Sequence, residues 1–187
     1  MSRAEFHRRY SQHPEIKKAE LVEGVVHLPS PVSLAHSRAH GLATVWLSHF
    51  VAVNRSVEVF IEPTILLDLD NEPQPDIVVR RLGPSRGEQS TYVDVPPDLV
   101  VEISGTTVSY DLHAKNNAYR RNGVQEYIVW RVLDEAIDWF ALVDGEYQPL
   151  RPDPDGVIHS EVFPGLRLAV AKLLEGDLGA VLAEQSS

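Results

Sequence analysis

Apolar and polar residues follow two different periods along the chain, one typical of helices and one of strands. From Ser33 to Val53 there is no proline, and apolar side chains recur at the spacing of one helix face, which predicts a long helix. A shorter helix is expected over residues 2–12. Between these helices, "KKAELVEGVVHLPSP" predicts two short strands joined by a turn at Glu23-Gly24.

The middle of the chain predicts strands and then a β-α-β unit. The first strands are expected at about 57–62, 64–68 and 76–80. A polar loop follows to about residue 95. "DLVVEIS" then predicts a strand, "SYDLHAKNNAYRRN" a helix that ends at Gly123, and "QEYIVWRV" a second strand, parallel to the first. A meander is expected over 135–170 and a short helix over 171–183.

This order of elements predicts an α/β protein with a mixed central sheet, a β-α-β crossover and flanking helices. A chain of 187 residues with 43% hydrophobic content favours a single domain over 1–187, with its core at about 19–170. The absence of cysteine excludes disulfides, thiolate catalysis and cysteine zinc sites. Neither a signal sequence nor a run of about eighteen apolar residues is present, so we expect a cytoplasmic protein without a membrane partner.

The net charge of −10 narrows the functions that the chain can have. Proteins that bind nucleic acid through bulk electrostatics carry patches of lysine and arginine. We therefore expect any contact with DNA to be local or assisted by a metal ion.

Two acids stand at positions where apolar strands begin or continue. Asp76 follows two prolines in "PQPDIVV", and Glu102 lies inside "PPDLVVEIS". Strand alternation places Glu102 on the same face as Val100 and Ser104. Because a β-α-β unit covers both faces of its strands, Glu102 is expected to be buried and paired with a hydrogen-bond donor or a cation. Two alternatives remain open, a solvent-facing strand for Glu102 and an ordinary loop cap for Asp76.

The helix after this strand carries a lysine on its apolar stripe. Lys115 is spaced with Leu112 and Tyr119 on one helix face, which should face the sheet. Lys115 is therefore expected to reach toward Glu102. A surface ion pair with Asp111 at i, i+4, worth only about 0.2–0.5 kcal/mol, is the alternative, and both contacts can coexist.

The histidines give no comparable signal. Among the eight, only His36 and His40 are spaced i, i+4, and no HExxH pattern accompanies them, so a solvated start of the long helix is expected. A nucleotide-binding glycine loop and a G-x-S-x-G elbow are both missing.

Taken in order, several segments resemble the Uma-type family of putative restriction endonucleases, bacterial members of the PD-(D/E)XK nuclease superfamily. The resemblance extends from about residue 19 to Leu168. It is carried by "AELVEGVV", "QPDIVV", "PPDLVVEIS", the spacing of Asp111, Lys115 and Tyr119, "GVQEYIVW" and "VFPGLRL". It implies a restriction-endonuclease-like core in which acidic residues gather around a divalent metal.

The resemblance also implies roles for individual residues. Asp76 matches the aspartate of the PD signature and Glu102 the second acid, which would make both ligands of Mg²⁺ or Mn²⁺. Glu20 matches the glutamate of an N-terminal family motif, and His36 matches a family histidine before the long helix. The implied catalytic set is Asp76, Glu102, Lys115 and Glu20.

One position departs from the superfamily pattern. A lysine is usual two residues after the second acid, but Ser104 stands there, and Lys115 on the following helix is the matching lysine. The implied reaction is metal-dependent hydrolysis of phosphodiester bonds in DNA. Carboxylate oxygens suit Mg²⁺ and Mn²⁺, and Lys115 would orient or help deprotonate a water and offset developing charge.

Two functions from other classes remain open. One is a catalytically silent module with the nuclease fold that serves binding or assembly, for which a homodimer is one arrangement. The other is a carboxylate-lined site on a small-molecule hydrolase or binding protein.

Overall fold

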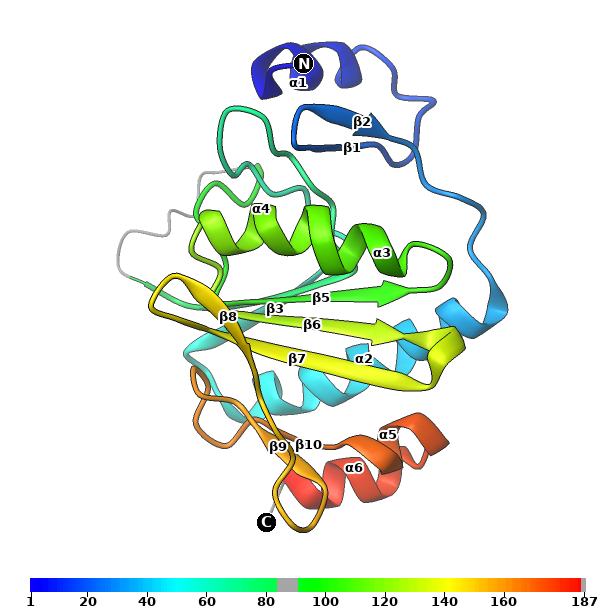
Figure 1. The fold of residues 1–187 in the computed structure, drawn as a ribbon, viewed down its shortest axis with the longest axis vertical. Coiled ribbons are helices and arrows are strands. Elements are labelled where there is room, and N and C mark those ends of the chain that lie inside the picture. Colours follow the sequence, from blue (N-terminus) through cyan, green and yellow to red (C-terminus); the bar gives the residue numbers. More distant parts are fainter. Residues whose placement is uncertain (84–90, 186–187) are drawn as a thin grey trace.

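The computed structural model describes residues 1–83 and 91–185, in which a mixed α/β fold surrounds a six-stranded sheet (Figure 1). The strands of this sheet are β3 (Val57–Ile61), β4 (Ile77–Arg81), β5 (Leu99–Ser104), β6 (Glu126–Arg131), β7 (Ala136–Val143) and β8 (Glu146–Pro149). Two smaller antiparallel pairs are β1 (Glu20–Val22) with β2 (Val25–His27), and β9 (Val157–His159) with β10 (Arg167–Ala169). The helices are α1 (Arg3–Tyr10), α2 (Leu34–Val53), α3 (Val108–Tyr110), α4 (Asn116–Arg121), α5 (Val170–Glu175) and α6 (Leu178–Gln185), with a π-helical turn η1 (Asp111–Lys115) and a 3-10 turn η2 (Val132–Asp134).

The sheet has the strand order β3-β4-β5-β6-β7-β8. Within it, β5 and β6 are parallel, and the other neighbours are antiparallel. The segment α3-η1-α4 crosses from β5 to β6, as a parallel pair requires. The predicted mixed sheet with a β-α-β crossover is confirmed.

Helices cover both faces of the sheet (Figure 1). Leu99 and Val101 of β5 pack in the same apolar cluster as Trp46 of α2, whereas Val100 packs with Tyr119 of α4. The two clusters follow the alternation predicted for β5. Because every residue of β5 is buried, the solvent-facing alternative is wrong.

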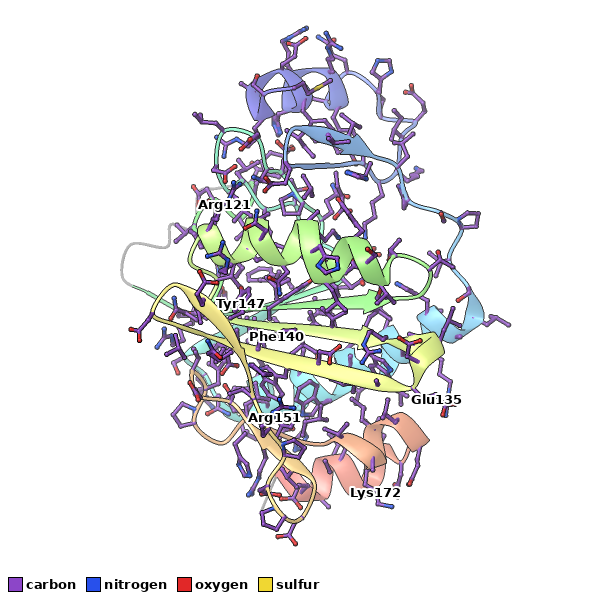
Figure 2. The ribbon with its side chains drawn as sticks, in the orientation of Figure 1. Arg121, Glu135, Phe140, Tyr147, Arg151 and Lys172 are labelled. Carbon is purple, nitrogen blue, oxygen red and sulfur yellow. The ribbon has the colours of Figure 1, made fainter. Side chains whose placement is uncertain are left out.

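Aromatic rings of strands β7 and β8 pack on the face of the sheet that α4 covers. Phe140 of β7 and Tyr147 of β8, labelled in Figure 2, lie 6.1 Å apart between ring centroids, and both pack against Tyr127 of β6. The hydroxyl of Tyr127 donates to the backbone oxygen of Asp111 at 3.0 Å. This bond attaches η1 to the sheet below it.

The N-terminal predictions agree with the structure. Ser33 caps α2 by accepting the backbone N–H of His36 at 3.1 Å. The hairpin of β1 and β2 turns at Glu23 and Gly24, both with positive φ, as a two-residue turn of this kind requires. Leu21 of the hairpin then pairs with Glu72, which attaches the hairpin to the segment before β4.

Residues 64–68, expected to be a strand, do not form one, so that prediction is wrong. Ile65 makes a single bridge with Val93. The backbone N–H groups of Ile65, Leu66 and Leu67 bond to Pro73, Val93 and Asn71, respectively. Successive residues therefore pair with different segments, and no ladder can continue.

Two further boundaries differ from the predictions. The helix expected over 171–183 is divided into α5 and α6 at Gly176, whose φ of +80° ends the first helix. The expected meander includes β7 and β8, but β9 and β10 form a pair of their own. Of the loop expected up to residue 95, residues 84–90 lie outside the described residues. None of the described helices is long and apolar enough to cross a membrane.

Candidate active site

Glu102 lies inside β5 and is buried on the face that α4 covers. Its Oε1 accepts hydrogen bonds from Lys115 Nζ at 2.9 Å and from the hydroxyl of Tyr119 at 2.8 Å. These two donors are one helical turn apart, so a single helix face supplies both. The buried carboxylate is paired, as the strand pattern predicted.

Lys115 is the cation at the centre of the cluster. Its Nζ also lies 2.9 Å from Glu20 Oε1 and 3.9 Å from Asp111 Oδ1. The i, i+4 pair with Asp111 therefore exists, but both residues are buried, so its interpretation as a surface ion pair is wrong. Lys115 ends the π-helical turn η1, a widened turn often found at functional sites.

Asp76 stands at the mouth of β4, directly before Ile77. The antiparallel register pairs Ile77 with Val101, and one further step places Asp76 across from Glu102. Its Oδ2 accepts the backbone N–H of Ile103 at 2.7 Å. Because the carboxylate bonds to the neighbouring strand, the loop-cap interpretation is wrong.

Three basic side chains lie close to Asp76. Lys18 Nζ is 3.7 Å from Oδ1, and His36 Nε2 is 3.6 Å from Oδ2. His40 Nε2 is 3.3 Å from the backbone oxygen. The prediction of a solvated helix start is therefore wrong for these histidines. Their i, i+4 spacing was a usable signal, whereas no local pattern near Lys18 indicates its contact.

Glu20 reaches the same cluster from β1. Its Oε1 accepts the backbone N–H of Gln74 at 2.8 Å and lies 2.9 Å from Lys115 Nζ. The structure thus brings together the four residues assigned to catalysis by resemblance. Lys115 contacts Glu20 and Glu102, and the strand register brings Asp76 to Glu102. Their catalytic role stays a prediction.

The two acids expected to bind metal have opposite pKa shifts. Burial raises the pKa of Glu102 to about 8, and the neighbouring carboxylates add to this effect against Lys115. Burial acts in the same direction at Asp76, but its basic neighbours and the backbone N–H outweigh it and lower the pKa. Burial disfavours the charge on Lys115, yet the surrounding carboxylates raise its pKa well above the usual value. Environments that separate the pKa values of two acids are typical of catalytic sites.

Tyr110 and His27 close the cluster on the side of the hairpin. Their ring centroids are 4.3 Å apart, and Lys115 Nζ lies 5.5 Å from the centre of the Tyr110 ring. The Tyr110 hydroxyl is buried and has no hydrogen-bond partner among the described residues. Neither residue was predicted from the sequence. The hairpin register, which pairs His27 with Glu20, was the available signal.

The donor set fits a divalent cation in its chemistry. Asp76 and Glu102 supply carboxylate oxygens, the hard ligands that Mg²⁺ and Mn²⁺ prefer. Lys115 contacts the carboxylates of Glu20, Glu102 and Asp111, and Asp76 adds to the repulsion that raises the pKa of Glu102, which a divalent cation would relieve. Within residues 1–83 and 91–185, however, no three histidine, aspartate or glutamate side chains already form a metal-binding group.

A family model covers nearly all of these elements. The model of Uma2, described as "Putative restriction endonuclease", matches residues 3–171. The chain belongs to the Uma2 family. This confirms the resemblance seen in the sequence, and the whole carboxylate cluster lies within the matched part of this Uma2 chain.

A solved structure shows the same fold. The chain is similar to the protein of the "Crystal structure of a putative nuclease belonging to DUF820 from Anabaena variabilis ATCC 29413". The two are 18% identical, with a TM-score of 0.68, over 84% of this Uma2 chain and 89% of that one. The predicted α/β core is thereby confirmed. A comparison with curated proteins found no match.

Proposed function

We propose that this Uma2 protein is a Mg²⁺- or Mn²⁺-dependent endonuclease that hydrolyses phosphodiester bonds in DNA. The observation that carries the proposal is the convergence of Asp76, Glu102 and Lys115, with the pKa values of the two acids displaced in opposite directions. The descriptions of the family and of the solved neighbour support the reaction class. The resemblance to PD-(D/E)XK nucleases supports a divalent metal.

Asp76 and Glu102 would hold the metal. The lowered pKa of Asp76 keeps its carboxylate ionised. Glu102, with a pKa of about 8, would release its proton when a cation arrives to offset its charge. When bound, the metal would neutralise charge on the scissile phosphate and lower the pKa of a water.

Lys115 would supply a fixed positive charge. Because its pKa is raised, it remains protonated and acts as a hydrogen-bond donor that orients water and offsets charge on the phosphate, rather than as a base. Glu20 would act as a positioning residue, since it holds Nζ at 2.9 Å. Lys115 reaches Glu102 from the helix, so the chain does not need a lysine at Ser104.

The acidic surface constrains how DNA would bind. A net charge of −10 disfavours broad contact with the phosphate backbone. Lys18, next to Asp76 and partly exposed, is a local cation that would face the phosphate. We therefore expect binding to depend on the metal and on this local contact.

A second candidate function is a catalytically silent module for binding or assembly. Lys115 already pairs with Glu20 and Glu102, so the protein can hold these carboxylates without a metal. A run of exposed apolar residues from β2 to the first residue of α2 would suit a homodimer contact: Val25, Val26, Leu28, Val32 and Leu34. Light scattering of the purified protein would detect such a dimer.

A nuclease assay combined with calorimetry separates these functions. Supercoiled, linear and single-stranded DNA are each incubated with the protein and Mg²⁺ or Mn²⁺, with chelator and Asp76→Asn as controls. We expect cleavage only with metal and only by the parent protein. Absence of Mn²⁺ binding in the calorimeter would support the silent module. Mn²⁺ binding without DNA cleavage would support a small-molecule hydrolase or binding site.

A further inference from the structure

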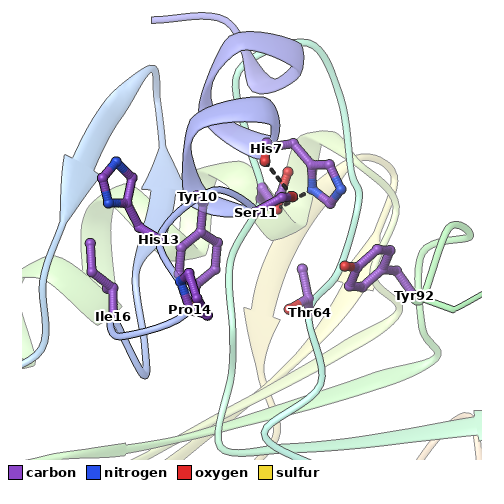
Figure 3. A pocket seen from close by; sticks show the side chains of 9 residues that line it. His7, Tyr10, Ser11, His13, Pro14, Ile16, Thr64 and Tyr92 are labelled. Atoms are coloured by element: carbon purple, nitrogen blue, oxygen red, sulfur yellow. Dashed lines mark hydrogen bonds and ion pairs between the residues drawn. The ribbon is translucent and has the colours of Figure 1, made fainter.

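A cavity of about 180 Å³ lies between α1 and the segment before β4 (Figure 3). This volume corresponds to about six water molecules and is smaller than the roughly 300–1,000 Å³ of pockets for drug-sized ligands. The cavity therefore suits a ligand with one small ring system. Residues of three separate segments line it, among them Tyr10, Thr64 and Tyr92.

Glu72 lines this cavity with a carboxylate that is only half satisfied. Its side chain is 1% exposed, and its Oε1 accepts a hydrogen bond from His7 Nδ1 at 2.8 Å. Its Oε2 is buried and has no partner among the described residues. A buried carboxylate oxygen without a donor costs free energy, and a ligand that brings an N–H group would remove this cost.

Two tyrosine rings contribute to the remaining walls. Figure 3 shows the rings of Tyr10 and Tyr92 on either side of Thr64. The ring of His7 meets Tyr92 edge to face, with 5.0 Å between centroids. Aromatic rings stack on planar heterocycles, whereas the carboxylate of Glu72 repels phosphate and other anions. The chemistry therefore selects a planar, uncharged ring with N–H donors.

A single residue connects the cavity to the candidate active site. The side-chain amide of Gln74 donates to Thr64 Oγ1 at 2.8 Å, and its backbone N–H donates to Glu20 Oε1 at 2.8 Å. Gln74 thus lies between the cavity wall and Glu20, and it is the contact through which a base held in the cavity would be linked to the candidate active site.

We propose that the cavity binds an unpaired nucleobase, with Glu72 accepting an N–H from the base edge. The inference rests on the proposed nuclease function and narrows its substrate to single-stranded or locally opened DNA. An enzyme reaches a base in this way only after the base has left the stack, which is least costly where no duplex exists.

Calorimetric titration of the metal-free protein with adenosine, guanosine and cytidine tests the cavity directly. We expect saturable binding at one site in the parent protein. Glu72→Gln keeps the side-chain shape but removes the negative charge, and should weaken binding at least about tenfold. Ser11→Leu, at an exposed position of the cavity wall, should fill the space and block binding. Glu175→Gln, an exposed acid on α5, should leave binding unchanged.

Thermal melts establish that each variant is folded. If Glu72→Gln does not fold, Ser11→Leu alone tests whether nucleosides bind in the cavity. Absence of saturable binding to the folded parent overturns the inference, and so does equal binding in Ser11→Leu. DNA cleavage is measured separately. Cleavage without nucleoside binding would overturn the cavity proposal alone, whereas nucleoside binding without cleavage would contradict the nuclease function and leave the base-binding cavity in place.

Discussion

Lys115 Nζ lies 2.9 Å from Glu102 Oε1, although thirteen positions separate these residues in the chain. The contact joins the crossover helix to the strand that precedes it. Because β5 and β6 are parallel, the helix must return across one face of β5, and Glu102 lies on that face. The β-α-β topology thus places the lysine over the carboxylate.

Replacing Lys115 with methionine should strongly destabilise the protein. The substitution leaves Glu20, Glu102 and Asp111 buried without their shared cation, and breaking one side of a buried ion pair costs about 3–5 kcal/mol. Urea denaturation measures the loss in the free energy of unfolding. The control is Lys172→Met, an exposed lysine labelled in Figure 2, for which a change within about 0.5 kcal/mol is expected. Equally small changes in both variants would contradict the central role of Lys115.

Two buried glutamates on neighbouring strands should respond differently to conversion into glutamine. At Glu102 the raised pKa shows that the charge is disfavoured in the fold, so Glu102→Gln should leave the melting temperature unchanged or raise it. Lys115 keeps Glu20 as a partner in this variant. Burial raises the pKa of Glu126 as well, but repulsion from other described carboxylates is not among the main causes, and its two oxygens accept bonds from Ser160, Trp139 and two backbone N–H groups. Glutamine has a single acceptor oxygen, so Glu126→Gln should cost about 1–3 kcal/mol.

Thermal melts without metal compare these two variants. A loss of several kcal/mol in Glu102→Gln would show that the carboxylate serves mainly to hold Lys115 and the fold together. The silent module would then be the better account of the cluster.

The stability of the metal-free protein should decrease between about pH 4.5 and pH 8. The pKa of Glu102 is raised in the fold from 4.5 to about 8, so the folded protein binds this proton more tightly than the unfolded chain does. The resulting stabilisation is complete below the unfolded pKa and is lost as the pH rises through about 8. Chemical denaturation at stepped pH should show this slope in the parent and a flatter one in Glu102→Gln. An identical slope in the parent and in Glu102→Gln would show that Glu102 is not the group that causes this pH dependence.

Mn²⁺ should raise the melting temperature of the parent protein. A ligand that binds only the folded state stabilises it by about 2.7 kcal/mol at a hundred times its Kd. The shift should disappear in Asp76→Asn and persist in Glu126→Gln, whose carboxylate lies outside the cluster. Differential scanning fluorimetry with and without Mn²⁺ measures it. A shift that survives Asp76→Asn would place the metal elsewhere.

The parts of the site that the sequence predicted depend on local periodicity. Residues two apart on a strand share a face, so Glu102 had to lie beneath the same helix as Val100. The same helix carries Lys115 and Tyr119 one turn apart, and both therefore reach one carboxylate oxygen. The resemblance to a family added Glu20, whose approach to Lys115 no local pattern indicates.

The features that the sequence did not predict come from contacts between distant segments. Lys18 and His36 meet Asp76 because the N-terminal segment and the start of α2 both pack beside the mouth of β4. The apolar run around Ile65 has the composition of a strand, but its backbone finds several partners instead of one. Tertiary packing decides both outcomes, and short-range patterns carry little information about it.

The rate of metal-dependent DNA cleavage in the parent, Glu102→Gln and Glu126→Gln proteins tests the nuclease function most directly. We expect the parent and Glu126→Gln to cleave DNA with Mn²⁺ and to be inactive with chelator, while Glu102→Gln, folded and equally stable, cleaves nothing. Cleavage by Glu102→Gln at the rate of the parent, or a folded parent that binds Mn²⁺ and cleaves no form of DNA, would contradict the proposed function.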